Sequence, residues 1–291
     1  MPGQLREIRR RIRSVQSTAK ITRAMELVAA SKMRRAQLNA LAGRPYAEKM
    51  RWVLADLAET LPLMDPETVH PLLKKREETK AVEVILVTPN RGLSGGLPTM
   101  LNRRAAQFIM DAGAPARVVA VGKKGRDFMR RTGQELVAEF LNIGDYPGYE
   151  EIRPLVHVVI QDFIEGKADE VYILYAQFVN TVVQRPELFK LLPVEAPEDA
   201  ETAAVDYIYE PTREGVLAEL LPRYIERQVY GAVLEAIASE QSARMVAMRN
   251  ATDNANELIK DLTLVYNKAR QESITSELLD ITGGVEALKG K

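Results

Sequence analysis

The last fifty or so residues constrain the fold of this sequence most, because they contain almost nothing that would end a helix. From Ser239 to Leu288 there is no proline, and the first glycines are the adjacent pair Gly283 and Gly284. Such a stretch predicts one continuous helix, and about fifty residues at a rise of about 1.5 Å each give a rod of roughly 75 Å. A globular domain of this size does not require so long a helix.

Apolar residues in this stretch recur in the pattern of a coiled-coil seam. They are separated by steps of 4, 3, 4, 3 and 4 residues, at Ala251, Ala255, Leu258, Leu262, Val265 and Ala269. A seam needs a partner helix. The same stretch is rich in asparagine, which helix propensity does not favour, and in small residues. Together these features indicate a rod that is contacted on most of its circumference.

Residues 4–41 predict a second long helix. Steps of 3, 4, 3 and 4 residues connect Leu5, Ile8, Ile12, Val15 and Ala19, and an apolar stripe continues on a shifted register through Ile21, Met25, Val28 and Ala29. Residues 1–41 carry ten basic and two acidic side chains, a net charge of +8. The run Gly43-Arg44-Pro45 should interrupt the helix, and a helical pattern resumes over residues 46–61.

Between the two helical ends, the sequence predicts a small α/β domain. Residues 62–80 contain three prolines and a charged run, and are expected to form a linker. Strands are expected at 82–87, 117–121, 136–140, 170–178, 182–192 and 205–209, helices at 99–112, 123–131 and 149–165, and an acidic loop at 196–204. Alternating strands and helices indicate parallel pairing, and Pro186 favours an edge position for the fifth strand. The last helix begins near Pro211 and Thr212, with a possible kink at Pro222.

The expected fold class is therefore α plus α/β, in which a long antiparallel coiled coil of the N- and C-terminal helices carries an inserted small Rossmann-like domain. The expected division is a helix over 1–61, a linker over 62–80, an α/β domain over 81–210 and a helix over 211–291. A short module that returns the chain near its entry point favours the antiparallel arrangement.

Composition excludes several kinds of function. Forty basic and forty acidic residues give no net charge, there is no cysteine, and the two histidines are His70 and His157. Disulfides and thiolate sites are thereby excluded, and we expect no metal and no cofactor. No apolar run reaches the roughly 18 residues that span a bilayer, and the basic N-terminus lacks the apolar core of a signal peptide. We expect an intracellular protein without direct membrane insertion.

Three local patterns allow other functions. The turn from Gly92 to Gly96 matches the G-x-S-x-G elbow of serine hydrolases, with Ser94 as nucleophile and His157 as the available base, but a plain tight strand-to-helix turn explains the glycines better. The run Gly122-Lys123-Lys124-Gly125 could hold an anion at a helix start, or simply begin a basic helix. The basic N-terminal helix could bind nucleic acid, but it has no aromatic residue for base stacking through Leu41.

Three stretches together carry a resemblance to a known family: Ile21–Glu26 with Ala29–Met33, the turn Arg91–Gly96, and the long run Ala243–Thr275, which includes Asn267-Lys268-Ala269-Arg270-Gln271. They resemble the gamma subunit of rotary F-type ATP synthases. The order of elements agrees over essentially the whole chain. The sequence has Asn90 where the family usually has Asp, Ser94 where it often has Cys and Pro98 where it often has Asn. It also lacks the cysteine-bearing insertion of photosynthetic relatives, so thiol control is not expected.

The resemblance implies a central rotor shaft without a catalytic site of its own. Its partners would be a ring of alpha and beta subunits around the helices, with the epsilon subunit and the membrane c-ring at the foot, on the cytoplasmic face of the cell membrane. Residues that match family contacts to the catalytic beta subunits are Met25, Arg244, Arg270 and Gln271. The coupling ion, H⁺ or Na⁺, is left open.

Overall fold

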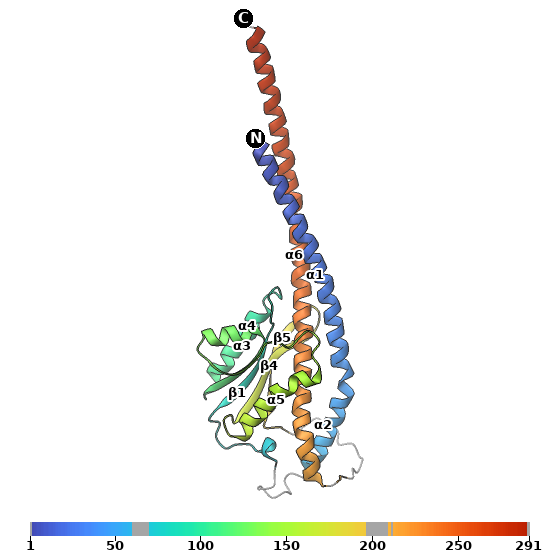
Figure 1. The fold of residues 1–291 in the computed structure, drawn as a ribbon, viewed down its shortest axis with the longest axis vertical. Helices are drawn as coiled ribbons and strands as arrows, with labels where there is room; N and C mark the ends of the chain where they lie inside the picture. The colour runs from blue at the N-terminus through green and yellow to red at the C-terminus, as the bar shows by residue number, and fades with distance from the viewer. Residues whose placement is uncertain (1, 60–69, 196–208, 211, 290–291) are drawn as a thin grey trace. The chain divides into compact units, whose positions relative to one another are not determined.

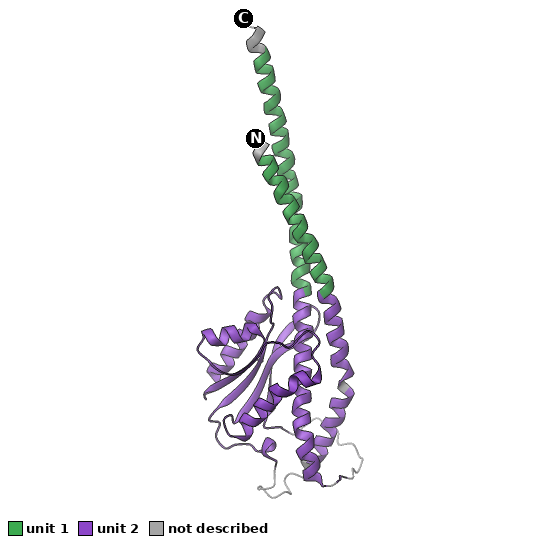
Figure 2. Cartoon of the chain, in the orientation of Figure 1, with its two compact units in different colours: residues 1–28, 245–291 green, residues 29–244 purple. Residues whose placement is uncertain are grey.

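The computed structural model describes residues 2–59, 70–195, 209–210 and 212–289. By packing, the chain forms two compact units. Unit 1 contains residues 1–28 and 245–291, and unit 2 contains residues 29–244 (Figure 2). The two terminal helices each contribute to both units. The division into four segments that the sequence predicts differs from these two units and remains a prediction.

The helices and strands follow the expected order (Figure 1). The helices are α1 (Pro2–Ala42), α2 (Arg44–Glu59), α3 (Leu97–Asp111), α4 (Lys123–Arg131), α5 (Tyr149–Ile164) and α6 (Arg213–Lys289), with a short 3-10 turn, η2 (Pro71–Leu73). The strands are β1 (Val82–Val87), β2 (Ala116–Val121), β3 (Glu135–Phe140), β4 (Glu170–Phe178) and β5 (Gln184–Leu192). Each expected element within the described residues is found to within about two residues at either end.

The breaks between helices fall where the sequence places them. Gly43 separates α1 from α2, whereas α6 runs without interruption through Pro222 and through the glycine pair near its end. The expected acidic loop at 196–204 lies outside the described residues. So does the expected strand at 205–209, apart from Tyr209, which is not in a strand.

The sheet of unit 2 has the strand order β3-β2-β1-β4-β5. The first four strands pair in parallel, and β5 pairs antiparallel with β4 at one edge. Pro186 lies in this edge strand, where its missing N–H need not serve a second neighbour. The expected parallel α/β sheet is confirmed.

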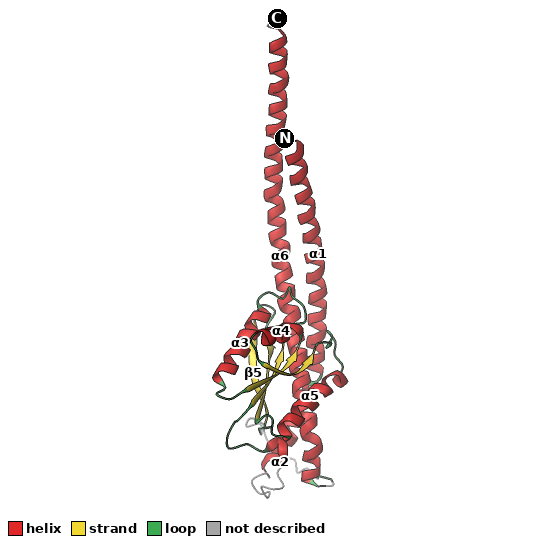
Figure 3. Cartoon of the chain, turned by 60° about the vertical axis from the view of Figure 1, so that its left-hand side comes forward, coloured by secondary structure: helices red, strands yellow, loops and turns green. Residues whose placement is uncertain are grey.

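Helices cover both faces of the sheet (Figure 3). One face of β1, through Ile85 and Val87, packs in the main core with residues of α2, α5 and α6. The other face, through Val84 and Leu86, packs against α3 and α4. The central strand β1 is therefore buried on both faces, which explains why it reads as a continuous apolar run in the sequence, whereas the edge strands β3 and β5 are mostly half-buried.

A charged cluster is buried under α5 at the amino-terminal end of the strands. Glu83 of β1 is fully buried beside Arg117 of β2, its register partner, at 3.7 Å. The same guanidinium lies 3.2 Å from Asp162 of α5 and 3.3 Å from Glu135 of β3. Burial and the neighbouring Asp162 raise the pKa of Glu83 to about 8. Arg117 is therefore shared by three carboxyl groups, of which Asp162 also pairs with Lys167 at 3.2 Å, and Glu83 retains its proton at neutral pH.

Candidate functional site

In unit 1, the terminal helices α1 and α6 pair in antiparallel orientation. Arg9 of α1 hydrogen-bonds the Tyr266 hydroxyl, the Thr22 and Thr252 hydroxyls are 2.7 Å apart, and Nε of Arg249 donates to Glu26 at 3.0 Å. Positions on α6 fall as positions on α1 rise. The antiparallel pairing that the sequence predicts is confirmed.

At alternate positions, the observed seam of α6 lies one residue further along the helix than the predicted seam. Ala255, Leu262 and Ala269 lie in the seam as predicted, but Leu258 and Val265 are exposed. The seam is formed by Met245, Met248, Thr252, Ala255, Ile259, Leu262, Tyr266, Ala269 and Ser273, and the predicted Ala251 is half-buried next to Thr252. Thr252 and Tyr266 enter the seam because they hydrogen-bond across it, an option that a search for apolar residues alone does not consider.

The seam of α1 shows the same effect. Leu5, Ile8, Ile12, Val15 and Ala19 are all half-buried or buried, as predicted. Beyond them the pattern continues through Thr22, Glu26 and Ala29. Of the predicted shifted stripe, Ala29 is buried and Met25 half-buried, but Ile21 and Val28 are exposed, so the shift of register is wrong at those two positions. Ile21 is 61% exposed. Two polar side chains keep the heptad spacing, and the neighbouring apolar side chain faces outward.

Glu26 is the buried charge of this seam. It is 4% exposed, and it accepts hydrogen bonds from Arg249 and from Arg23, the latter at 2.7 Å. Burial alone would raise the pKa of Glu26, but the two arginines outweigh it and lower that pKa below its usual value. The sequence offered a signal that the prediction did not use, since Glu26 is one of two acids in a strongly basic stretch.

The outward face of unit 1 is rich in large apolar side chains. Ile21, Leu27 and Val28 of α1 and Leu264 and Val265 of α6 are all exposed. Towards the C-terminal end of α6, the exposed apolar residues are Ile274, Leu278, Leu279, Ile281 and Val285. A helical pair with this much exposed apolar surface is typical of a subunit covered by partners in an assembly.

The predicted contact residues of unit 1 lie at two levels of the helical pair. Met25 is half-buried next to Glu26, which faces Arg249. Arg270 and Gln271 are exposed on α6, about twenty residues further along. At about 1.5 Å per residue, this is a separation of about 30 Å, so the structure does not bring Met25 together with the other two.

Arg244, the fourth predicted contact residue, is held within unit 2. Its side chain is 11% exposed, its guanidinium pairs with Glu240 one turn earlier on α6, and it also donates to the Gly92 carbonyl at 3.4 Å. Glu240 and the turn that follows β1 therefore fix the orientation of this guanidinium before any partner binds.

The turn after β1 lacks the features of a hydrolase elbow. Ser94 is buried, its hydroxyl has no hydrogen-bond partner among the described residues, and His157 is an exposed residue of α5. The turn packs on α6 because Leu97 and Leu101, which follow it, cluster with Ala243. The glycines thus serve a tight strand-to-helix turn, and the hydrolase alternative is not supported.

The start of α4 is also accounted for locally. Its backbone N–H groups at Lys123 and Gly125 donate to Asn90 and Thr88, at 3.1 and 2.8 Å. Gly122 has φ of 96°, and a Cβ there would lie 1.9 Å from the Thr88 carbonyl oxygen. The run of glycines and lysines is therefore explained by close packing of this helix against the loop after β1.

Taken together, the paired helices with their exposed apolar side chains and the small α/β module define a class: a subunit that meets partners in a larger assembly. No helix among the described residues combines the length and the apolarity that a membrane span requires.

Comparison with known proteins gives the family. The family model described as ATP synthase matches residues 4–288. The ATP synthase gamma chain of Dehalococcoides mccartyi is 56% identical over 286 residues, covering 98% of this chain and 99% of the relative. That of Chloroflexus aurantiacus is 54% identical over 291 residues, covering 99% of both. The chain therefore belongs to the gamma-chain family of ATP synthases.

Solved structures agree on the fold. A chain in the mitochondrial ATP synthase of Euglena gracilis superimposes with a TM-score of 0.68 at 21% identity, covering 99% of this chain and 95% of that one. A central-stalk chain of the Tetrahymena thermophila enzyme gives 0.61 at 24% identity, covering 79% and 99%. Through its family, the chain is the central rotor shaft of an F-type ATP synthase and couples ion flow to conformational change at the sites where ATP is made.

Proposed function

We propose that the chain acts on the catalytic beta subunits through Met25, Arg244, Arg270 and Gln271. The exposure of Arg270 and Gln271 supports this role, since both offer hydrogen-bond donors to a surrounding surface. Met25 offers a flexible apolar contact beside the buried Glu26, and Arg244 offers a guanidinium held in place by Glu240.

The proposed mechanism is a bias on open and closed forms of the catalytic subunits. A shaft without three-fold symmetry presents a different face to each subunit of a ring that is nearly symmetric. A face shifts a subunit only by the difference in its contact energy with the two forms. Taking a site from mostly one form to mostly the other requires about 5.5 kcal/mol. Two or three hydrogen bonds to charged groups, at about 1.5–3 kcal/mol each, supply that amount.

We further propose that the chain has no catalytic site and works with a ring of alpha and beta subunits, the epsilon subunit and the membrane c-ring. It would lie on the cytoplasmic face of the cell membrane and be held there by these partners. The full-length chain alone is then expected to show no ATPase activity. Mixing it with alpha and beta subunits is expected to yield an active complex, and failure to co-purify with them would count against these partners.

Replacing Arg270 tests the contact proposal. Arg270→Ala removes an exposed guanidinium from α6 and leaves the seam untouched, so it should lower the ATPase rate of the assembled complex without changing the stability of the chain. Losing one charge-assisted hydrogen bond predicts a roughly ten-fold decrease. The matched control is Lys260→Ala, an exposed cation on the same helix. Equal turnover of the two variants would remove Arg270 from the mechanism.

A further inference from the structure

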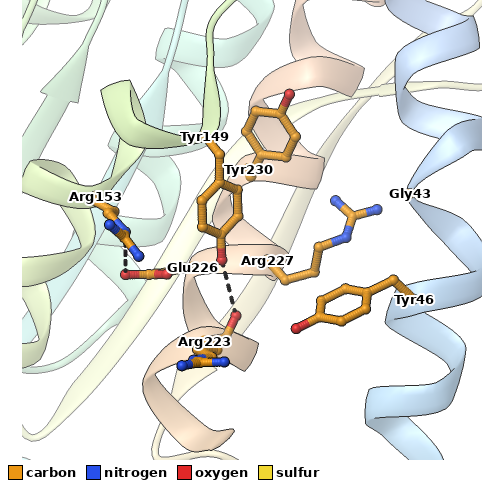
Figure 4. A pocket seen from close by; sticks show the side chains of 8 residues that line it. All are labelled: Gly43, Tyr46, Tyr149, Arg153, Arg223, Glu226, Arg227 and Tyr230. Atoms are coloured by element: carbon orange, nitrogen blue, oxygen red, sulfur yellow. Dashed lines mark hydrogen bonds and ion pairs between the residues drawn. The ribbon is translucent and has the colours of Figure 1, made fainter. Parts of the chain in front are cut away.

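A pocket of about 500 Å³ lies in unit 2, and none of the predicted contact residues lines it. The junction of α1 and α2 contributes Gly43 and Tyr46, α5 contributes Tyr149 and Arg153, and α6 contributes the remaining wall (Figure 4). This volume is in the range of small-molecule sites. The pocket belongs to neither the sheet nor the exposed helical pair of unit 1, and the rotor function does not use it.

The lining of this pocket is rich in arginine. It contains Arg153, Arg223 and Arg227, but only one acid, Glu226. Nε of Arg153 lies 3.6 Å from Glu226, and its Nη1 lies 2.9 Å from Glu150, so this arginine is paired. Within the described part of the chain, the guanidinium groups of Arg223 and Arg227 pair with no carboxylate. Among the described residues, two positive charges on successive turns of α6 are therefore left without a carboxylate partner.

Arg227 is held in the pocket by shape rather than by an opposite charge. Its side chain is half-buried and points toward Gly43, with the ring of Tyr46 beside it (Figure 4). A Cβ at Gly43 would lie 2.1 Å from Nη2 of Arg227, so a larger residue at this position would displace the guanidinium from its place. The ring centre of Tyr230 is 6.0 Å from the guanidinium carbon, within reach of a weak cation–π contact.

Two tyrosines, Tyr149 and Tyr230, form an aromatic side of this pocket, and their hydroxyl groups act as hydrogen-bond donors. Tyr149 and Tyr230 pack edge to face, with ring centres 5.5 Å apart. The Tyr230 hydroxyl donates to the Pro147 carbonyl at 3.3 Å, and the Tyr149 hydroxyl donates to the Arg223 carbonyl at 3.5 Å. Burial and the neighbouring Glu226 raise the pKa of Tyr149, which therefore remains a neutral donor at physiological pH.

We propose that this pocket binds the phosphate group of a small molecule through Arg223 and Arg227. With Arg153 and Glu226 paired to one another, the unpaired charge of the lining is +2, which matches a phosphate of about −1.5 to −2 at pH 7 better than a single carboxylate. The planar guanidinium fork suits phosphate oxygens, and the two arginines lie four residues apart on one helix face. The phosphate could be free, carried by a nucleotide or part of a lipid headgroup.

Calorimetric titration of the full-length chain at low ionic strength and pH 7.5 tests the proposal, with inorganic phosphate, AMP and vesicles of phosphatidic acid in phosphatidylcholine as three separate probes. We expect saturable binding of inorganic phosphate, weakened about ten-fold in Arg223→Gln and in Arg227→Gln. Arg104→Gln, an exposed arginine of α3, is the matched control and should bind as the original chain does. Tighter binding of AMP would assign a nucleotide-like source, and tighter binding of vesicles a lipid source.

A second variant keeps both arginines. Gly43→Ala places a methyl group against the guanidinium of Arg227 and should weaken phosphate binding while every charge is retained. The fluorescence of Trp52, on the neighbouring helix α2, reports whether each variant is folded. Absence of saturable binding to all three probes would overturn the proposal. Binding that is unchanged in both arginine variants, or equally weakened in Arg104→Gln, would overturn it as well.

Discussion

The buried carboxyl of Glu83 makes the stability of unit 2 depend on pH in a way that one substitution should remove. The native pKa of Glu83 is about 8, against 4.5 for an ordinary glutamate. The stabilising contribution of the bound proton is therefore fully present below pH 4.5 and is lost as the pH rises through 8. Between those values the native state holds a proton that the unfolded chain has released, and the free energy of unfolding falls by about 1.4 kcal/mol per pH unit.

Glu83→Gln keeps the shape and a hydrogen-bond donor toward Asp162 but cannot ionise. At pH 5 the variant should match the original chain to within about 1 kcal/mol, because a neutral carboxyl and an amide are nearly isosteric. At pH 8 the variant should be the more stable by about 4 kcal/mol, which is three pH units of the slope above. Subtracting the two chains cancels the titration of all other groups.

Urea unfolding followed by Trp52 fluorescence measures this difference. Trp52 is the single tryptophan, and its helix α2 packs through Leu54 and Leu57 in the same core as Ile85 of β1. Glu135→Gln is the control, because Glu135 contacts the same Arg117 but its side chain is 66% exposed. A difference between Glu83→Gln and the original chain that stays constant from pH 5 to pH 8 would refute the reasoning, since Glu83 would then be ionised in the native state.

Two further predictions concern the helical pair of unit 1. Ile259→Asp should destabilise the helical pair by about 2–3 kcal/mol, because Ile259 lies in the seam, whereas Leu258→Asp on the exposed side should change its stability by less than about 0.5 kcal/mol. Hydrogen exchange of the α1 amides measures both effects. Equal effects of the two substitutions would support the seam predicted from apolar spacing. Thr22→Val and Thr252→Val should each lower the free energy of unfolding by about 1 kcal/mol. The double variant should lower it by less than the sum, because no hydroxyl is then left facing an apolar partner. A double-mutant cycle measures this coupling, and strict additivity would show that the 2.7 Å contact contributes nothing.

The helices and strands of this fold could be predicted well from the sequence, because glycines and prolines mark most of their ends. Gly43 ends α1, the turn from Gly92 to Gly96 separates β1 from α3, and no breaker interrupts α6 beyond Pro222. The central strands β1 and β2 are largely buried and read as short apolar runs between such signals. Local chemistry was sufficient for these features.

The seam of the helical pair could be predicted only in part, because apolarity is not what selects every seam residue. Thr22, Glu26, Thr252 and Tyr266 occupy seam positions through hydrogen bonds or ion pairs that join residues more than 200 positions apart. A search for apolar residues replaced them with neighbours, such as Ile21, that face outward. The pocket in unit 2 was also not predicted, because three segments that are far apart in the sequence build it. The contact residues Met25, Arg244, Arg270 and Gln271 came from the family resemblance and remain predictions.

The account depends on α1 and α6 turning together as one shaft, and cross-linking these helices tests it most directly. The chain has no cysteine, so Thr22→Cys with Thr252→Cys introduces a single possible disulfide at a contact of 2.7 Å. In a complex with alpha and beta subunits, a rod attached to the α/β module is followed during ATP hydrolysis. The account predicts unidirectional rotation at the same rate before and after oxidation. Rotation that stops on oxidation and resumes on reduction would show that the helices must move relative to one another, and would contradict it.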